Sequence, residues 1–217
     1  MAYTLPDGSK LFLSTTTGPA VAISGITNDN PAAATANGHT LTANAVGILT
    51  TGWEDANERV FRVGSPEANT FTLMGLDATS TNLYTPGSGA GSFLPITGWQ
   101  EIQQVLNPST SGGEQQYTTV EPLARKNAIQ LPTSISPMTI TIPIGDDPSL
   151  PGYIALKAAS DNRELRALRI QKPNGATNYF YGYVSLNEVP SLTKGQVDTV
   201  TASFALQGMP TRYTTAV

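Results

Sequence analysis

Short runs of alternating apolar and polar residues, each closed by glycine, proline, asparagine or aspartate, restrict the fold of this chain more than any other feature. The clearest run covers residues 197–207. Its apolar side chains fall on one face and its hydroxyl side chains on the other: Val200, Ala202, Phe204 and Leu206 against Thr199, Thr201 and Ser203. A period of two residues is the spacing of a β-strand with one buried face. The chain is therefore expected to consist mainly of strands.

The same pattern predicts further strands along the chain, at 10–15, 20–26, 32–36, 46–51, 59–63, 70–73, 99–106, 118–122 and 137–144. A hairpin is also indicated, with strands at 165–171 and 177–189 around the turn Lys172-Pro173-Asn174-Gly175, because Asn-Gly favours a tight turn. In its second strand one face receives aliphatic and phenyl groups and the other receives three tyrosines: Phe180, Val184 and Leu186 against Tyr179, Tyr181 and Tyr183.

One segment departs from the alternating pattern and predicts a single flanking helix at about 148–160. Asp147 is the expected N-cap and Pro148 the first helical residue, where a missing amide proton costs nothing. The neighbouring carboxylates of Asp146 and Asp147 therefore indicate capping more than a metal site. Apolar residues at helical spacing, expected to pack on a sheet, are Leu150, Ile154 and Ala158.

These elements predict a mainly β fold: a two-sheet β-sandwich or partly closed barrel with one flanking α-helix. The whole chain, 1–217, is expected to form a single domain, with an N-terminal β subdomain at about 1–92 and a C-terminal half at about 93–217. The boundary is the glycine-rich stretch at 84–92. The polar segment 107–116 has no apolar anchor, so it is predicted to be a mobile loop in the free subunit that becomes ordered on assembly.

Only 13% of the residues are charged, and the net charge is −4. An ordinary soluble domain carries about 25% charged residues. A neutral polar surface indicates either an extracellular β-sandwich or a subunit whose surface is covered by copies of itself. The absence of a basic excess argues against nucleic-acid binding, and the absence of cysteine excludes disulfides and thiolate zinc sites. The first residues show no signal peptide, and no apolar run is long enough to cross a membrane.

The residue types that carry catalysis are sparse. His39 is the only histidine, which excludes two-histidine metal sites and leaves one candidate for a serine triad. Glu54, Asp55 and Glu58 are read as solvated loop charges and not as paired catalytic carboxylates. The glycines of 87–91 lack the lysine and helix of a phosphate loop. The chain is therefore predicted not to be an enzyme and to bind no cofactor or metal.

Five of the twelve basic residues fall within the predicted helix and hairpin: Lys157, Arg163, Arg166, Arg169 and Lys172. The nearby aromatic residues alternate on a strand and are explained by sheet packing, so a nucleic-acid patch is disfavoured. We predict that this cluster is a subunit-contact surface that meets acidic groups of another copy.

Four blocks of the C-terminal part carry a resemblance to a known family: DDPSLPGY, ALKAASD, YVSLNEVPSLTK and TVTASFALQG. In this order they resemble the major tail tube protein of long, non-contractile-tailed (siphovirus-type) bacteriophages. The similarity extends over nearly the whole chain and includes the stretch VGILTTGW and the strand NTFTL. Relatives in lambda-like phages carry a further immunoglobulin-like domain after the tube domain, and this chain is expected to lack it.

The resemblance implies a structural virion protein, made in the cytoplasm of the host bacterium, that forms hexameric rings stacked head-to-tail into a tail tube. Expected partners are other copies of the chain and the tail terminator, tape measure and distal tail proteins. The genome would pass through the tube during ejection without specific binding, and no membrane or cofactor is involved. Given the net charge, the channel wall is expected to be net negative. The alternative from the composition is an extracellular β-sandwich binding module, carbohydrate-binding or adhesin-like.

Overall fold

The computed structural model describes residues 6–214 and is mainly β, with 49% strand and 7% helix, as the sequence predicts. The ends of the chain, 1–5 and 215–217, lie outside the described residues. The first of these belong to the N-terminal stretch for which the sequence predicts no signal peptide. The first half contains β1 (Lys10–Thr17), β2 (Val21–Ile23), β3 (Gly25–Ile26), β4 (Ala33–Thr35), β5 (Val46–Thr51), the 3₁₀ turn η1 (Glu54–Ala56), β6 (Arg59–Gly64) and β7 (Thr70–Met74).

The second half begins with a long strand and contains the α-helix. Its elements are β8 (Gly91–Ile102), β9 (Ser109–Ser111), β10 (Gln115–Val120), β11 (Ile129–Ile135), β12 (Thr139–Gly145), α1 (Pro151–Asp161), β13 (Leu165–Gln171), β14 (Thr177–Ser191), β15 (Thr199–Leu206) and β16 (Thr211–Tyr213).

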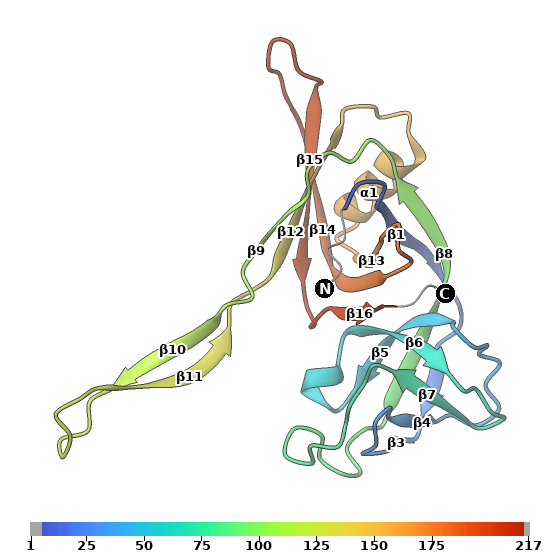
Figure 1. Cartoon of the computed structure of the whole chain (residues 1–217). Helices are drawn as coiled ribbons and strands as arrows, with labels where there is room; N and C mark the ends of the chain where they lie inside the picture. Colours follow the sequence, from blue (N-terminus) through green and yellow to red (C-terminus); the bar gives the residue numbers. More distant parts are fainter. Residues whose placement is uncertain (1–5, 215–217) are drawn as a thin grey trace.

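Most strands belong to one curled sheet, with the order β3-β4-β7-β6-β5-β8-β1-β13-β14-β15-β12-β9 (Figure 1). β2 pairs with β8, and β16 pairs with β14. β10 and β11 form a separate two-stranded sheet. Among the described elements, α1 is the only α-helix, and it covers one face of the second half of the curled sheet.

β8 joins the two halves of the molecule. Its first part pairs with β2 and β5, and its second part pairs with β1. The sequence predicted a strand only from residue 99, which was wrong by about eight residues, because Gly91, Pro95 and Gly98 interrupt the apolar pattern. Gly91 is required there, since a Cβ at this position would lie 1.9 Å from the carbonyl oxygen of Thr50. The organisation as one domain with a boundary near residue 92 stays a prediction.

Three groups of buried side chains fill the molecule. The first lies within the N-terminal half and includes Trp53, Phe61, Phe71 and Phe93. The second lies between α1 and the strands β1, β8 and β12 to β15. The third connects the halves and contains Val60, Ala167, Tyr179 and Tyr213.

Tyr213 fixes the junction between the halves by two hydrogen bonds. Its hydroxyl donates to the carbonyl oxygen of Met74 at 2.7 Å and accepts from the backbone N–H of Arg62 at 2.9 Å. The Arg62 guanidinium is buried and lies over the Tyr213 ring, 4.2 Å from its centroid. Burial raises the pKa of Tyr213 to about 12.

The predicted helix exists but begins three residues later and packs on a different face. Leu150 is the N-cap and Pro151 occupies the first turn, while the Asp147 carboxylate accepts hydrogen bonds from Ser149 in the preceding turn. Ile154 and Ala158, expected to be buried, are exposed. The buried face consists of Gly152, Tyr153, Leu156 and Ala159. Tyr153, Leu156 and Ala159 are spaced by three residues, so they form a second apolar stripe, and this one, which includes the aromatic ring, packs on the sheet.

The hairpin and the last long strand agree with the sequence analysis. β13 and β14 pair with Gln171 opposite Thr177, across the predicted turn. In β14 the Phe180 and Val184 side chains contact the core under α1, while Tyr179 and Tyr181 contact the core between the halves. In β15 the predicted inward residues Val200, Ala202 and Phe204 are buried.

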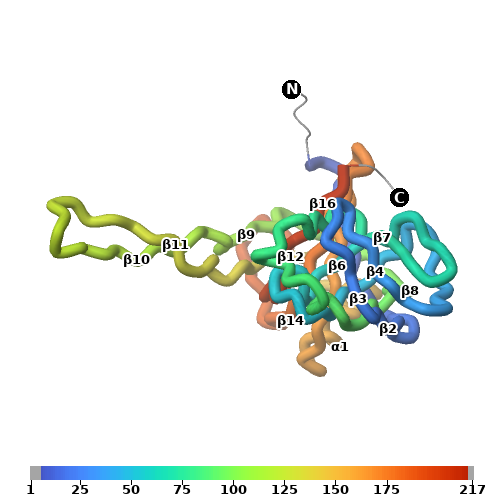
Figure 2. Tube along the Cα trace, turned by 90° about the horizontal axis from the view of Figure 1, so that it is seen from below, coloured from blue at the N-terminus to red at the C-terminus, as the bar shows by residue number. Residues whose placement is uncertain are grey.

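The prediction of an irregular loop at 107–116 was wrong in part. This segment contains β9 and the start of β10, and β11 was not predicted at all. β10 and β11 form a long arm that extends away from the rest of the molecule (Figures 1 and 2). Serine, threonine and glutamine on these strands hide the alternation that the sequence analysis used as its signal.

Within residues 6–214, no helix has both the length and the apolar character needed to cross a membrane.

Candidate assembly surfaces

The five basic residues of the predicted cluster are distributed over several places. Arg163 precedes β13 and Lys172 follows it, so the length of the strand separates them. Arg166 and Arg169 are three residues apart on β13 and therefore point to opposite faces. The structure does not bring the five together on one surface, and their contact with another subunit stays a prediction.

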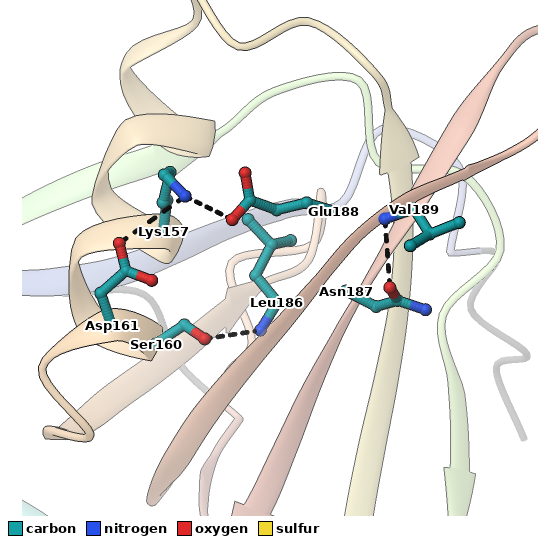
Figure 3. Close-up of polar contacts among 7 residues, drawn as sticks. All are labelled: Lys157, Ser160, Asp161, Leu186, Asn187, Glu188 and Val189. Atoms are coloured by element: carbon teal, nitrogen blue, oxygen red, sulfur yellow. Dashed lines mark hydrogen bonds and ion pairs between the residues drawn. The ribbon is translucent and has the colours of Figure 1, made fainter.

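Two of these cations have acidic partners within the chain. Lys157 on α1 pairs with Asp161 at 3.6 Å and with Glu188 of β14 (Figure 3). The hydrogen bond from Lys157 to Glu188 raises the pKa of the lysine. Arg166 pairs with Glu164 and donates to the carbonyl oxygen of Thr15. Lys157 thus contacts β14 from α1, and Arg166 contacts β1 from β13.

Arg169 is held by aromatic rings. Its guanidinium carbon lies 4.1 Å from the ring centroid of Phe12 and 4.7 Å from that of Trp99. Burial lowers the pKa of this guanidinium. Arg169 thus packs as a flat side chain against the sheet.

The other polar residues singled out in the sequence form local structure. The His39 ring contacts the carbonyl oxygen of Thr70 and the backbone N–H of Leu41, in a packed turn. Glu54 and Asp55 lie in the exposed turn η1. No cluster of three or more metal-ligating side chains occurs in the part of the chain that the structure describes.

The arm is the most exposed part of the described chain. All residues of β10 are exposed, as are all residues of β11 except Ile129. Five of the exposed side chains of the arm are apolar: Tyr117, Val120, Leu123, Leu131 and Ile135. An isolated two-stranded hairpin is only marginally stable in water. The arm therefore presents apolar surface that its own chain does not cover.

Both faces of the arm are apolar. Thr118 pairs with Leu131, and Val120 pairs with Ile129, so these four side chains share one face, called here the aliphatic face. Tyr117 pairs with Pro132 on the other face, and a register shift between Gln115 and Tyr117 brings Ile135, which pairs with Gln115, to that face as well. An arm of this kind is suited to contacts on two sides.

Gly112 directs the arm away from the body. Its φ is +80°, a conformation that L side chains rarely adopt. A Cβ there would lie 1.8 Å from the carbonyl oxygen of Pro137, at the other strand of the arm's base. The two chain segments approach so closely that only glycine fits.

A second protrusion is the far end of the β14–β15 hairpin, residues 188–198, called here the hairpin end (Figure 1). The register shifts from Asn187 opposite Thr201 to Ser191 opposite Thr199, so two extra residues bulge out of β14. The Asn187 side-chain oxygen accepts from the backbone N–H of Val189 at 3.1 Å within this bulge. Figure 3 shows the result: Glu188 points to α1, and Val189 points away from it.

A third surface is the sheet face opposite α1, formed by β9, β12, β15 and the end of β14. Residues that pair across these strands share a face, and three rows result: Ser111–Thr139–Ala205–Tyr183, Ser109–Thr141–Ser203–Ser185 and Pro143–Thr201–Asn187. Most of these side chains are hydroxyl-bearing and none is charged. We call this surface the hydroxyl face.

Comparison with known protein families shows which class of protein carries these surfaces. A family model described as phage tail tube protein (TTP) matches residues 51–215, which include the arm, the hairpin end and the hydroxyl face. This chain belongs to the phage tail tube protein family. A search of curated proteins gave no match.

As a tail tube protein, the chain is a structural component of the virion that assembles into a tube with copies of itself and with other tail proteins. The resemblance noted in the sequence is thereby confirmed. The sequence analysis connected the segment 107–116 with assembly but did not predict the arm that continues it, and it did not distinguish the hydroxyl face. The signal for that face was the abundance of threonine and serine, which indicated a neutral polar exterior, either of an extracellular β-sandwich or of a subunit covered by copies of itself.

Proposed function

We propose that this tail tube protein forms hexameric rings that stack head-to-tail, and that the tube conducts the genome out of the head during ejection. Its role is structural and not catalytic. It is made in the host cytoplasm, and its partners besides itself are the tail terminator, tape measure and distal tail proteins. The family match supports the tube, and the arm is the observation that carries the mode of assembly.

The arm supports a contact between different surfaces of successive copies. Its apolar side chains are exposed on a hairpin that extends away from its own body (Figure 2). Burial of apolar surface is the main driving force of association. An arm that binds a different surface on the next copy makes a heterologous contact, and such contacts extend without closing on themselves.

The hydroxyl face supports the passage of DNA without binding. A basic wall would neutralise phosphates and gain affinity by releasing counterions. Threonine, serine and asparagine side chains offer hydrogen bonds to water and carry no charge. We therefore place the hydroxyl face toward the channel, which gives an uncharged wall in place of the net negative wall expected from the total charge.

Electron microscopy and sedimentation of the purified protein test the assembly. The wild-type chain is expected to form rings and tubes at high concentration. A variant in which residues 113–136 are replaced by a short Gly-Ser turn is expected to keep a cooperative unfolding transition and to form no tubes. The matched control is Leu83→Ser, which removes an exposed apolar side chain elsewhere. Tubes formed by the armless variant would overturn the proposed role of the arm.

A further inference from the structure

The most exposed apolar side chains gather on the two protrusions. Leu123, at the tip of the arm, is fully exposed, and the next three are all on the hairpin end: Val189 at 74%, Leu192 at 71% and Val197 at 70%. These are the highest values among the large apolar residues of the described chain. Apolar side chains gathered in this way mark interaction sites.

The two protrusions leave opposite ends of the same pair of strands. The arm enters β12 at Thr139, which pairs with Ala205 near the end of β15. The hairpin end enters β15 at Thr199, which pairs with Gly145 at the other end of β12. One copy therefore offers its arm at one end of this strand pair and its hairpin end at the other, the arrangement that a head-to-tail contact requires.

The base of the hairpin end is attached to α1. The Oγ of Ser160 on α1 accepts from the backbone N–H of Leu186 at 3.0 Å, and Lys157 pairs with Glu188 at the base of the hairpin end (Figure 3). A hollow of about 360 Å³ lies beside it, lined by Leu106, Ser191, Thr193, Gln196, Val197 and Thr199. Leu106 and Val197 give this otherwise polar hollow an apolar side that a side chain from another molecule can contact.

We propose that the aliphatic face and tip of the arm bind the hairpin end of the next copy along the tube. This contact rests on the proposed function, and it adds the surface to which the arm binds. Leu131, Val120 and Ile129 cover Val189, Leu192 and Val197 of the neighbour, and Leu123 enters the hollow beside Leu106. The contact buries the four most exposed apolar side chains of the described chain.

Both surfaces carry charges of both signs, since Glu121 precedes the turn of the arm and Lys194 lies in the turn of the hairpin end, but each also offers a pair of like charges opposite in sign to the other pair. The turn of the arm carries Arg125 and Lys126, and the base of the hairpin end carries Asp198 next to Asp146, whose backbone N–H donates to the Asp198 carbonyl oxygen. None of these four side chains forms an ion pair within residues 6–214. Opposite charges on meeting surfaces fix register and orientation.

Cross-linking tests the contact, and the cysteine-free chain makes the test clean. The variant Leu131→Cys/Val197→Cys is assembled, and a short bifunctional maleimide is added. A ladder of covalent dimers, trimers and longer products is expected, because each copy donates one thiol to each neighbour. Each single variant is expected to remain monomeric on a denaturing gel. The matched control pair is Leu131→Cys/Leu83→Cys, which keeps the arm thiol and moves the other to the N-terminal half. Tubes that give no ladder with the first pair, or the same ladder with the control pair, overturn the inference.

A complementation experiment covers the case in which a variant does not assemble. Leu131→Asp disables the arm and Val197→Asp disables the hairpin end, so each alone is expected to form no tubes. Their mixture retains one intact arm and one intact hairpin end, and is expected to yield particles of two joined units that do not grow further. No joining in the mixture overturns this inference while wild-type tubes leave the proposed function intact. A wild-type chain that forms no tubes overturns both.

Discussion

At the scale of single residues, Phe204 shows how one strand separates core from surface. Its side chain is buried under α1, whereas Thr201 of the same strand points to the hydroxyl face. We predict that Phe204→Ala lowers the free energy of unfolding by about 3 to 5 kcal/mol, because it empties a packed position. Thr201→Ala is the matched control and should change it by less than about 0.5 kcal/mol. Thermal or denaturant unfolding of the free subunit measures both, and an unchanged midpoint for Phe204→Ala would contradict the assignment of the faces.

Tyr213 gives a prediction that depends on pH. Tyr213→Phe keeps the ring under Arg62 but leaves the Arg62 N–H and the Met74 carbonyl oxygen without this partner, which should cost about 1 to 3 kcal/mol at pH 7. The folded pKa of Tyr213 is raised to about 12, above the value of about 10 in an unfolded chain. The unfolded state therefore loses its proton first, and stability present below pH ~10 falls as the pH rises towards the folded pKa.

The advantage of the wild type over Tyr213→Phe should accordingly shrink between about pH 10 and 12. Denaturant unfolding of both proteins at pH 7 and at several values above 10 gives this difference directly. All other ionisable groups are the same in both proteins, so their contributions cancel in the comparison. A difference that grows with pH would contradict the buried, hydrogen-bonded position of the hydroxyl.

At the scale of elements, α1 is attached to β14 by one neutral hydrogen bond and one ion pair, and the neutral bond should matter more. Ser160→Ala leaves the partly buried N–H of Leu186 without its acceptor, so a loss of about 1 to 3 kcal/mol in unfolding free energy is expected. Glu188→Gln breaks an ion pair whose side chains are 43% and 49% exposed, and solvent screens such pairs. We predict a much smaller shift of the unfolding midpoint for Glu188→Gln. The opposite order would show that the charge pair holds the helix.

The direction of the arm depends on a glycine. Gly112→Ala places a Cβ against the Pro137 carbonyl oxygen and strains a positive φ, so the base of the arm must open. Because the arm has almost no buried side chains, the stability of the body should change little, but tubes should be lost. Gly25→Ala is the control, since its Cβ meets nothing within 4 Å. Microscopy and thermal unfolding together separate the two effects, and normal tubes from Gly112→Ala would contradict this role.

At the scale of the whole molecule, the sequence predicted the elements that show regular alternation and missed those that depend on distant contacts. The strands around Phe204 and the turn at Asn174-Gly175 were found because their signals are local. The start of α1 was misplaced because Asp147 and Pro148 have the residue types of a cap but form a turn before the helix. Within the arm, the strand predicted at 118–122 overlaps β10, but β11 was missed, because strands that are stabilised little by burial need no apolar period. The surface that the arm contacts lies on another copy of the chain, so no short stretch of the sequence indicates it.

The hydroxyl face gives a prediction for the complete tube. Ser185 is exposed at the β14 end of the middle row of this face, and Asn82 is exposed in a loop of the N-terminal half. We predict that tubes of Ser185→Lys retain duplex DNA at low salt and release it as salt increases, because added lysines in the channel neutralise phosphates and displace counterions. Tubes of the wild type and of Asn82→Lys, which adds the same charge elsewhere, should retain far less. Co-sedimentation of DNA with tubes over a salt series measures the effect, and particles carrying Ser185→Lys should eject their genome more slowly. Equal retention by the two lysine variants would show that the hydroxyl face does not line the channel. The two variants add the same charge, so they should differ in DNA retention only if Ser185 faces the channel and Asn82 does not.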